Sequence, residues 1–326
     1  MKNNHYLFGD WCQLDDFSVV IDKIRSFSQN ILASPFDPSL LFNALEKTAK
    51  ELSVSEIDAE TRAFLAVDYW QEKVLRELGT FDFLEFRRSH FDKARFEAYQ
   101  PLGILLHITP GNFALAGLGP VLEGLVTGNV NLLKQSSRAV DNAHEILTTI
   151  LNNDSTGQLK KRVAILQLSS KEEEKMKLLY RLADGIAVWG GDQTIAAVKK
   201  AAPLHVRIIP WGHKISMAYV TKELMNDNQS LASLARDCVA LEQQACSSPQ
   251  IIYGETSGWS DLGDFARKFL WILQAESLKI APSELTVQEQ AEITNNEELI
   301  RLESIEGQSL LLKGEHCRLL VENDSQ

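Results

Sequence analysis

The sequence has few cysteines and no pairing pattern among them. Its four cysteines form no Cys-x-x-Cys pair and have no histidine at zinc-finger spacing, so we expect neither a disulfide framework nor a metal site. They are Cys12, Cys238, Cys246 and Cys317. Reduced thiols of this kind are compatible with a reactive, catalytic cysteine.

The chain also lacks an excess of basic residues and long hydrophobic runs. A formal charge of −11, without clustered Lys and Arg, excludes a nucleic-acid surface, which needs concentrated positive charge. The N-terminus has no apolar core of signal-peptide length, and no later stretch reaches the roughly 18 apolar residues of a membrane span. We therefore expect a cytoplasmic protein with no membrane span.

Helical spacing dominates the first part of the chain. With 326 residues, 44% of them hydrophobic, the chain is long enough for about two domains. Between residues 15 and 95 apolar side chains recur at helical intervals, for example Phe17, Ile21 and Ile24. This pattern predicts a layer of amphipathic helices without catalytic residues.

After Pro101 the pattern changes to short apolar runs that alternate with helical segments. Five such runs are predicted strands: residues 103–108, 130–134, 163–168, 186–189 and 206–210. Strands joined by helical crossovers imply a Rossmann-like parallel sheet covered on both faces, with ligands at the edge where the strands end.

A second α/β domain follows. It is predicted from strands at 215–220 and 250–253 and helices at about 222–239 and 260–278. The expected division is residues 1–214 for the N-terminal helices and cofactor-binding sheet, and residues 215–326 for a catalytic domain.

The first strand end carries the segment Thr109-Pro110-Gly111-Asn112, followed by a helical pattern at residues 113–126. Asn112 would either cap that helix or offer its amide to an oxyanion. Glycines 117, 119 and 124 do not fit Gly-x-Gly-x-x-Gly, and they favour close packing of a helix on the sheet over phosphate contact.

Lys134, with Ser136 and Ser137, ends the second strand. These residues suit ribose or phosphate oxygens, although a solvated strand-end lysine has the same pattern. Gly190 and Gly191 precede a predicted helix, whose free N–H groups would either meet a pyrophosphate or belong to a turn capped by the following aspartate.

The last strand end carries Gly212 and His213. His213 could act as a general acid or base, but a lone histidine beside glycine and tryptophan is more often structural, and the same holds for His107. Cys246 stands in the small, polar segment Gln-Gln-Ala-Cys-Ser-Ser-Pro, unlike the helical surroundings of Cys238. That setting is compatible with an exposed nucleophile, but a thiolate needs a stabilising neighbour that the sequence does not show.

Taken in order, these motifs resemble the aldehyde dehydrogenase superfamily. The phrases His-x-x-Pro-Gly-Asn, Ile-Pro-Trp-Gly-His-Lys-Ile-Ser and Glu-Gln-Gln-Ala-Cys-Ser-Ser-Pro-Gln are similar to those of LuxC-type acyl-CoA reductases, the fatty acid reductase subunit of bacterial bioluminescence. The similarity is close over residues 81–254 and looser after residue 259.

The resemblance implies a role for each motif. Cys246 would be the nucleophile, and Asn112 the oxyanion donor together with the backbone N–H of Cys246. Lys134 would reach the adenosine ribose, and Gly190 and Gly191 would border the cofactor phosphates. Thr109, Pro110, Ser136, Ser137 and Gly212 would complete the cofactor site, and no metal is required.

Two departures from the superfamily pattern agree with reduction of an acyl group. Pro210 stands where aldehyde-oxidising members have the glutamate that activates water, so an acyl-enzyme would survive until hydride arrives. Ser137 stands where NAD-using members commonly have a glutamate against the ribose, so NADPH is the expected cofactor. The implied activity is reduction of long-chain acyl-CoA, or another activated fatty acyl group, to a fatty aldehyde.

A third departure is the short segment after Cys246, which predicts an incomplete catalytic domain. Family members work with acyl-transferring partners, so the resemblance implies an acyltransferase or synthetase partner, and a homo-oligomer if the C-terminal part is complete. The alternatives are an aldehyde-oxidising NAD(P) dehydrogenase and a non-catalytic binding subunit of an acyl-transferring complex.

Overall fold

The computed structural model describes residues 4–14, 16–52, 59–89, 91–109, 117–135, 143–212, 214–243, 247–280, 287–305 and 309–322. The chain divides into two compact units, Met1–Gly212 and His213–Gln326. Each unit has its own hydrophobic core, and each is described separately.

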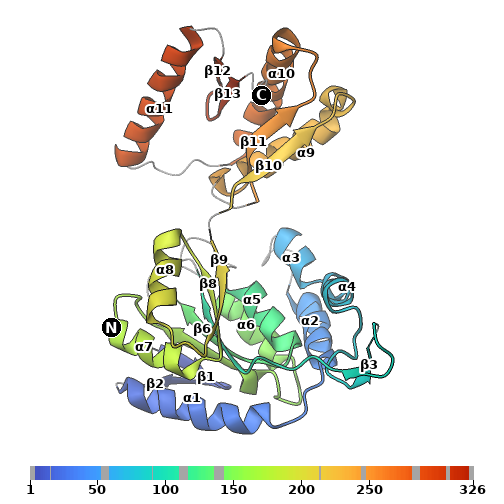
Figure 1. The fold of residues 1–326 in the computed structure, drawn as a ribbon, viewed down its shortest axis with the longest axis vertical. Helices are drawn as coiled ribbons and strands as arrows, with labels where there is room; N and C mark the ends of the chain where they lie inside the picture. Colours follow the sequence, from blue (N-terminus) through green and yellow to red (C-terminus); the bar gives the residue numbers. More distant parts are fainter. Residues whose placement is uncertain are drawn as a thin grey trace. The chain divides into compact units, whose positions relative to one another are not determined.

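A seven-stranded sheet forms the centre of the first unit, in the order β2-β1-β7-β6-β5-β8-β9 (Figure 1). Five neighbouring strands are parallel: β7 (Val163–Gln167), β6 (Val130–Gln135), β5 (Ile104–Ile108), β8 (Gly185–Trp189) and β9 (Arg207–Trp211). These are the five predicted strands, each within two residues of its expected ends. Their apolar runs are continuous because a parallel sheet covered by helices buries both faces.

Helices cover both faces of this sheet (Figure 1). On one face lie α2 (Ser39–Glu51), α3 (Ala59–Leu65), α4 (Val67–Leu78), α5 (Leu118–Val126) and α6 (Ala143–Asn152), whose core includes Leu133 and Ile165. On the other lie α1 (Phe17–Leu32), α7 (Glu173–Leu182) and α8 (Asp192–Ala201), whose core includes Leu132 and Leu166. Successive strand residues thus enter opposite cores, as the pleat requires.

Two strands at one edge of the sheet were not predicted. Strands β1 (Asn4–Leu7) and β2 (Asp10–Gln13) form a hairpin, and β1 pairs antiparallel with β7 through Tyr6 and Ile165. Phe8 and Gly9 turn the hairpin with φ of 57° and 119°, and such positive values match the twist of two adjacent strands. Strands of four residues give too little alternation to be recognised in a sequence.

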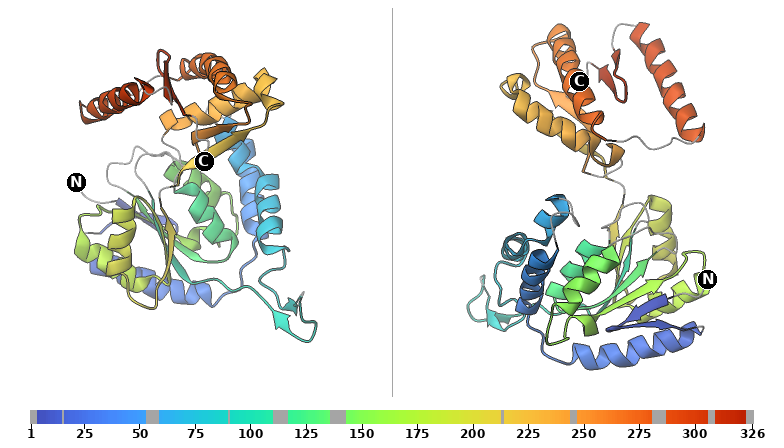
Figure 2. Two further views of the ribbon diagram at one scale, coloured as in Figure 1. Left: turned by 45° about the horizontal axis from the view of Figure 1, so that its top comes forward. Right: turned by 180° about the vertical axis from the view of Figure 1, so that it is seen from behind.

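Helix was also predicted up to about residue 95, whereas the last helix of this region, α4, ends at Leu78. Gly79, at φ 75°, ends α4 in the left-handed conformation that glycine adopts without steric cost. The chain then forms a small hairpin of β3 (Arg87–Arg88) and β4 (Phe96–Glu97), which projects from the unit (Figure 2). A short helix, η1 (Lys160–Arg162), precedes β7.

The second unit pairs β10 (Ser216–Val220) with β11 (Pro249–Gly254) in parallel and packs them on α9 (Asn228–Val239) and α10 (Trp259–Ser277). α9 begins later than predicted, because the Asp227 carboxylate accepts hydrogen bonds from the N–H groups of Gln229 and Ser230 and so caps it. The remaining elements are η2 (Leu224–Asn226), η3 (Ala240–Gln243), α11 (Val287–Ile305), β12 (Ser309–Lys313) and β13 (Arg318–Glu322). Among the described residues, no helix has both the length and the hydropathy to cross a membrane.

Candidate functional site

The carboxyl edge of the parallel sheet gathers five of the predicted site residues. Along this edge, in spatial order, Lys134 lies on β6, Thr109 follows β5, Gly190 and Gly191 follow β8, and Gly212 follows β9. The helix after β5 covers one face of the sheet and the helix after β8 covers the other. Ligands of open α/β sheets bind at such a switch point, because diverging connections leave a crevice there.

Lys134 is a buried lysine rather than a solvated one. Its residue is only 4% exposed, and Nζ donates a hydrogen bond to Oγ of Ser170 at 2.7 Å. Burial lowers the pKa of Lys134, while the negative charge of Glu172 opposes that shift. A desolvated ammonium held at a ligand-binding edge is suited to an anionic partner.

Ser170 was missed by the sequence analysis. It lies in the connection between β7 and α7, directly after a strand that had been recognised. The sequence contains a pattern that could have identified Ser170: Ser169 and Ser170 follow an apolar run, as Ser136 and Ser137 do. In the same connection, Glu172 accepts hydrogen bonds from the backbone N–H of Ser169 at 2.9 Å and from Nζ of Lys175 at 2.5 Å.

The N-terminus of α8 has no side-chain cap. Gly191 is the cap residue and makes no side-chain hydrogen bond, so the alternative of a turn capped by Asp192 is not what forms. A Cβ added at Gly191 would meet no atom within 4 Å, so the space in front of this turn is open. A Cβ at Gly212 would lie 3.3 Å from Cδ1 of Ile195, which shows that Gly212 packs against the same helix.

His107 is structural, as the alternative interpretation held. The residue is 2% exposed, and its Nε2 lies 2.9 Å from Oδ1 of Asn131. Nδ2 of Asn131 donates to the carbonyl of Asn129, so Oδ1 is the acceptor for His107. Burial lowers the pKa of His107 to about 4, which keeps the imidazole neutral.

Two of the glycines after β5 allow a helix to approach the sheet closely. A Cβ at Gly117 would lie 2.9 Å from Cδ2 of Leu133, and one at Gly124 would lie 1.8 Å from Oδ1 of Asn131. Glycine is therefore required by packing at these positions, as predicted. α5 begins at Leu118, and the predicted start at residue 113 lies outside the described residues.

None of the three cysteines in the described ranges has the features of a nucleophile. Burial raises the pKa of the Cys238 thiol to about 11, with a further contribution from Asp237. Burial also raises the pKa values of Cys12 and Cys317. All three are free of disulfides, and these environments favour the unreactive thiol over the thiolate.

The chain on both sides of residues 244–246 is tied together. Nε2 of Gln243 donates to the carbonyl of Pro249 at 3.1 Å, and Oγ of the buried Ser248 donates to the carbonyl of Ala240 at 3.1 Å. Gln243 has a φ of 62°, in the left-handed region that a non-glycine residue rarely adopts. These bonds fix the two ends of the segment that contains Cys246.

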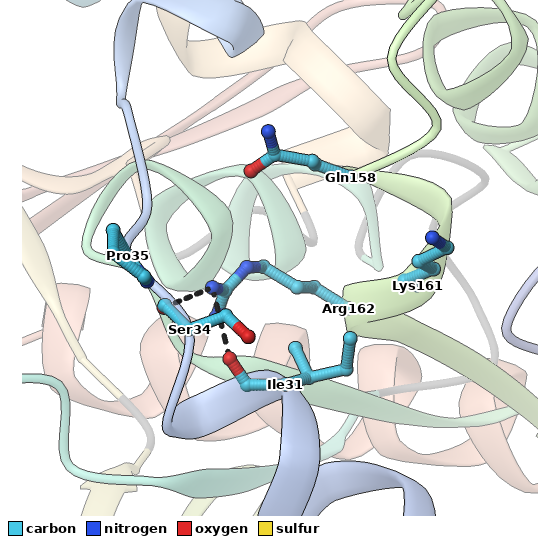
Figure 3. A pocket seen from close by; sticks show the side chains of 6 residues that line it. All are labelled: Ile31, Ser34, Pro35, Gln158, Lys161 and Arg162. Carbon is cyan, nitrogen blue, oxygen red and sulfur yellow. Dashed lines mark hydrogen bonds between the residues drawn. The ribbon is translucent and has the colours of Figure 1, made fainter.

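A pocket of about 250 Å³ lies at the opposite, amino-terminal edge of the sheet (Figure 3). Its principal side chain, Arg162, is 3% exposed and donates to the carbonyl oxygens of Gly128, Ile31 and Ser34. The guanidinium also lies over the ring of Phe36. Because these contacts hold the end of α1 against the sheet, the pocket reflects a structural arginine rather than a binding site.

Six residues of interest lie outside the described residues: Pro110, Asn112, Ser136, Ser137, His213 and Cys246. Their assigned roles stay predictions. Within the described ranges, no three His, Cys, Asp or Glu side chains come together in a way that could hold a metal ion.

The architecture is that of an aldehyde dehydrogenase-like α/β protein. It is similar to lactaldehyde dehydrogenase from Escherichia coli, with a TM-score of 0.66 and 15% identity, covering 97% of this chain and 76% of the other. It is also similar to an indole-3-acetaldehyde dehydrogenase in complex with NAD⁺, with a TM-score of 0.66 and 13% identity, covering 96% and 71%. At these identities the likeness establishes the fold.

The chain belongs to the acyl-CoA reductase (LuxC) family, whose family model matches residues 17–321. A long-chain acyl-protein thioester reductase of Aliivibrio fischeri is 30% identical over 158 residues, which cover 47% of this chain and 32% of that protein. The matched stretch thus spans about a third of that relative's length. The resemblance seen in the motifs is confirmed.

Proposed function

We propose that this protein reduces activated long-chain acyl groups to fatty aldehydes, through a thioester on Cys246 and with NADPH as the reductant. The observation that carries the proposal is the carboxyl edge of the sheet, where a buried lysine and an uncapped helix N-terminus line a switch point. Family membership and the name of the matched relative support the same activity.

The residues of this edge fit a dinucleotide. Backbone N–H groups in the first turn of α8 are free of side-chain caps and face open space beside Gly191, which suits a pyrophosphate. Lys134 and Ser170 offer an ammonium and a hydroxyl at the neighbouring strand ends, which suits the adenosine ribose and its substituents. The bound cofactor would supply hydride.

Preference for NADPH over NADH is part of the proposal. Ser137, in place of an acidic residue, leaves no carboxylate there to repel a 2′-phosphate. Lys134, near the end of β6, adds a positive charge, and Ser170 adds a hydroxyl donor from the β7–α7 connection. An ammonium and hydroxyl donors suit phosphate oxygens better than they suit an uncharged ribose.

Cys246 is proposed as the nucleophile. Its thiolate would attack the acyl carbonyl carbon and expel the thiol of the donor, which forms a thioester on the enzyme. Hydride addition to the thioester carbon and protonation would give a thiohemiacetal, whose collapse releases aldehyde and restores the thiolate. Asn112 and the backbone N–H of Cys246 are the proposed donors to the oxyanion in both steps. The raised pKa values of Cys12, Cys238 and Cys317 support this choice, because those thiols resist ionisation.

Pro210 supports reduction over aldehyde oxidation. It lies on β9, an edge strand of the sheet, where the missing N–H of proline is tolerated. Proline cannot take a proton from water, so position 210 provides no base for hydrolysis of a thioester. The acyl-enzyme would therefore persist until hydride reaches it.

The donor is proposed to be a fatty acyl-CoA or an acyl group delivered by a carrier protein, including an acyltransferase or synthetase partner. Assembly of several copies of the chain is proposed as well. Family membership supports these proposals. They remain proposals because the matched stretch covers only part of the relative.

Intact-mass measurement tests the nucleophile directly. The chain is mixed with a long-chain acyl-CoA in the absence of NADPH, and we expect one acyl adduct that Cys246→Ala abolishes. Cys238→Ala is the matched control and should retain the adduct, because the Cys238 thiol is buried and resists ionisation. An adduct that survives in Cys246→Ala contradicts the assignment of the nucleophile.

Product analysis separates the alternative functions. Addition of NADPH to the acylated protein should release fatty aldehyde. Free acid formed from added aldehyde, with NADP⁺ reduced, would favour an aldehyde-oxidising dehydrogenase. Binding of acyl-CoA and nucleotide without an adduct or product would favour a non-catalytic subunit.

A further inference from the structure

Two tryptophans lie side by side at the ends of neighbouring strands. Trp189 ends β8 and Trp211 ends β9, and the two residues are direct partners in the parallel register. Their ring planes differ by 4°, and the ring centroids are 5.8 Å apart. The two indoles are thus stacked on one another at the carboxyl edge of the sheet.

Core packing does not account for this pair. Ile186 and Val188 of β8 enter the core under α1, α7 and α8, so Trp189 points to the opposite face. Neither tryptophan belongs to a buried cluster, and Trp211 is 48% exposed. Burial of a large aromatic ring normally stabilises a protein, so an exposed indole at a ligand-binding edge suggests another use.

A neighbouring side chain and a backbone hydrogen bond hold the tryptophan pair in place. The ring centroid of His107 lies 6.5 Å from that of Trp189, and His107 is itself fixed by Asn131. The backbone N–H of Gly190 donates to the carbonyl of Trp211 at 3.3 Å, which joins the two strand ends. The aromatic surface is therefore preorganised, and a ring that stacks on it loses little further freedom to ordering of the protein.

We propose that Trp189 and Trp211 form an aromatic platform on which the nicotinamide ring of the cofactor stacks, and that this contact positions the ring for hydride transfer. The inference rests on the proposed function, because it takes the bound group to be NADPH. It adds two positioning residues that the strand-end motifs did not single out.

The position of the pair indicates the nicotinamide end of the cofactor rather than the adenine end. Lys134 shares a sheet face with Leu132 and the core under α7, while the tryptophans lie on the other face. A dinucleotide with its adenosine half at Lys134 would cross the edge at the switch point between β5 and β8. From β6 to β9 there are three strand spacings, about 14 Å, a distance that an extended dinucleotide spans.

Exposure alone would not single out this pair, and the chain provides a control. Trp271 on α10 is 82% exposed, more than Trp211, but it belongs to the second unit and to none of the strand ends described above. A general effect of losing an exposed indole should therefore appear in Trp271→Ala, whereas an effect on the platform should not.

Calorimetric titration with two nucleotides isolates the nicotinamide contact. One is NADPH, and the other is 2′-phospho-ADP-ribose, which lacks only the nicotinamide. We expect the 326-residue chain to bind NADPH about tenfold more tightly, the ratio expected for one stacked ring. Trp211→Ala should reduce this ratio to about one and leave the affinity for 2′-phospho-ADP-ribose unchanged, while Trp211→Phe should give an intermediate ratio. Trp271→Ala should behave as the parent chain.

The outcomes distinguish the platform from the cofactor assignment. If the parent chain binds neither nucleotide, the proposed use of NADPH fails and the platform fails with it. If the parent binds both nucleotides and Trp211→Ala keeps the parent ratio, or loses both affinities equally, the cofactor assignment stands and the platform is wrong.

Discussion

Nε2 of His107 and Oδ1 of Asn131 lie 2.9 Å apart in the interior of the first unit. Asn131 also donates to the carbonyl of Asn129, and the side-chain oxygen of Asn129 accepts from the backbone N–H of Gly103 at 3.0 Å. A chain of polar groups thus links β5 to the first residues of β6. Buried polar groups that are hydrogen-bonded in this way fix one arrangement of the strands.

The neutral state of His107 predicts a loss of stability in acid. Its pKa is about 4 in the folded protein and 6.5 in the reference state, so the unfolded chain takes up the proton first. Stability is therefore complete above pH 6.5 and falls as the pH decreases towards 4, by up to about 3 kcal/mol. Urea unfolding across this range should show a smaller acid-dependent loss in His107→Gln than in the parent. His205→Gln, at an exposed position, is the control and should follow the parent curve.

Gly124 and Gly191 make a matched pair for testing steric requirements. Gly124→Ala would place Cβ 1.8 Å from Oδ1 of Asn131 and should cost about 2 kcal/mol or more, through overpacking and a disturbed buried hydrogen bond. Gly191→Ala meets nothing within 4 Å, so its free energy of unfolding should change by less than about 0.5 kcal/mol. Equal destabilisation of the two variants would show that the α5 contact is looser than the structure indicates.

Lys134→Met separates a binding role from a structural one. The substitution removes a buried charge at similar volume, so the free energy of unfolding should stay the same or increase. The affinity for NADPH should fall about tenfold or more, since a charged hydrogen bond contributes about 1.5–3 kcal/mol. Unchanged NADPH affinity together with a large loss of stability would assign Lys134 to the core instead.

Arg162→Met should destabilise the protein without affecting nucleotide binding. The variant leaves the carbonyl oxygens of Gly128, Ile31 and Ser34 without their donor, and we expect a loss of about 2–4 kcal/mol in chemical denaturation. Lys161→Met, on the same turn but exposed, should stay close to the parent. If Arg162→Met is fully folded and still loses most of its affinity for NADPH, then the pocket in Figure 3 has a binding role.

The five parallel strands could be predicted because each is a short apolar run with a helix between it and the next, and all but the edge strand β9 are buried on both faces. β1 and β2 could not, since they have only four residues each and β1 joins the sheet by pairing with β7, which is remote in the sequence. The start of α9 was misplaced because one capping carboxylate, that of Asp227, decides it. The local sequence pattern thus identifies helices and strands, whereas their first and last residues depend on single contacts.

The candidate site could likewise be predicted only in part. Lys134, Gly190, Gly191 and Gly212 were predictable because strand ends in a parallel sheet converge on one edge, whatever the details of packing. Burial of Lys134 and its contact with Ser170 were not, because they depend on how the β7–α7 connection folds over the end of β6. The parallel rings of Trp189 and Trp211 follow from a strand register that the sequence does not encode locally.

The hairpin of β1 and β2 has a consequence for biosynthesis. Its docking partner on β7 is about 160 residues further along the chain, so β1 is synthesised long before the strand that gives it a place in the sheet. Until then Tyr6 and Leu7, which are buried in the folded unit, remain exposed to other chains. Pulse-labelling of amide exchange during refolding should find the β1 amides protected after those of β5 and β6, which makes docking of the N-terminal hairpin a late step in folding.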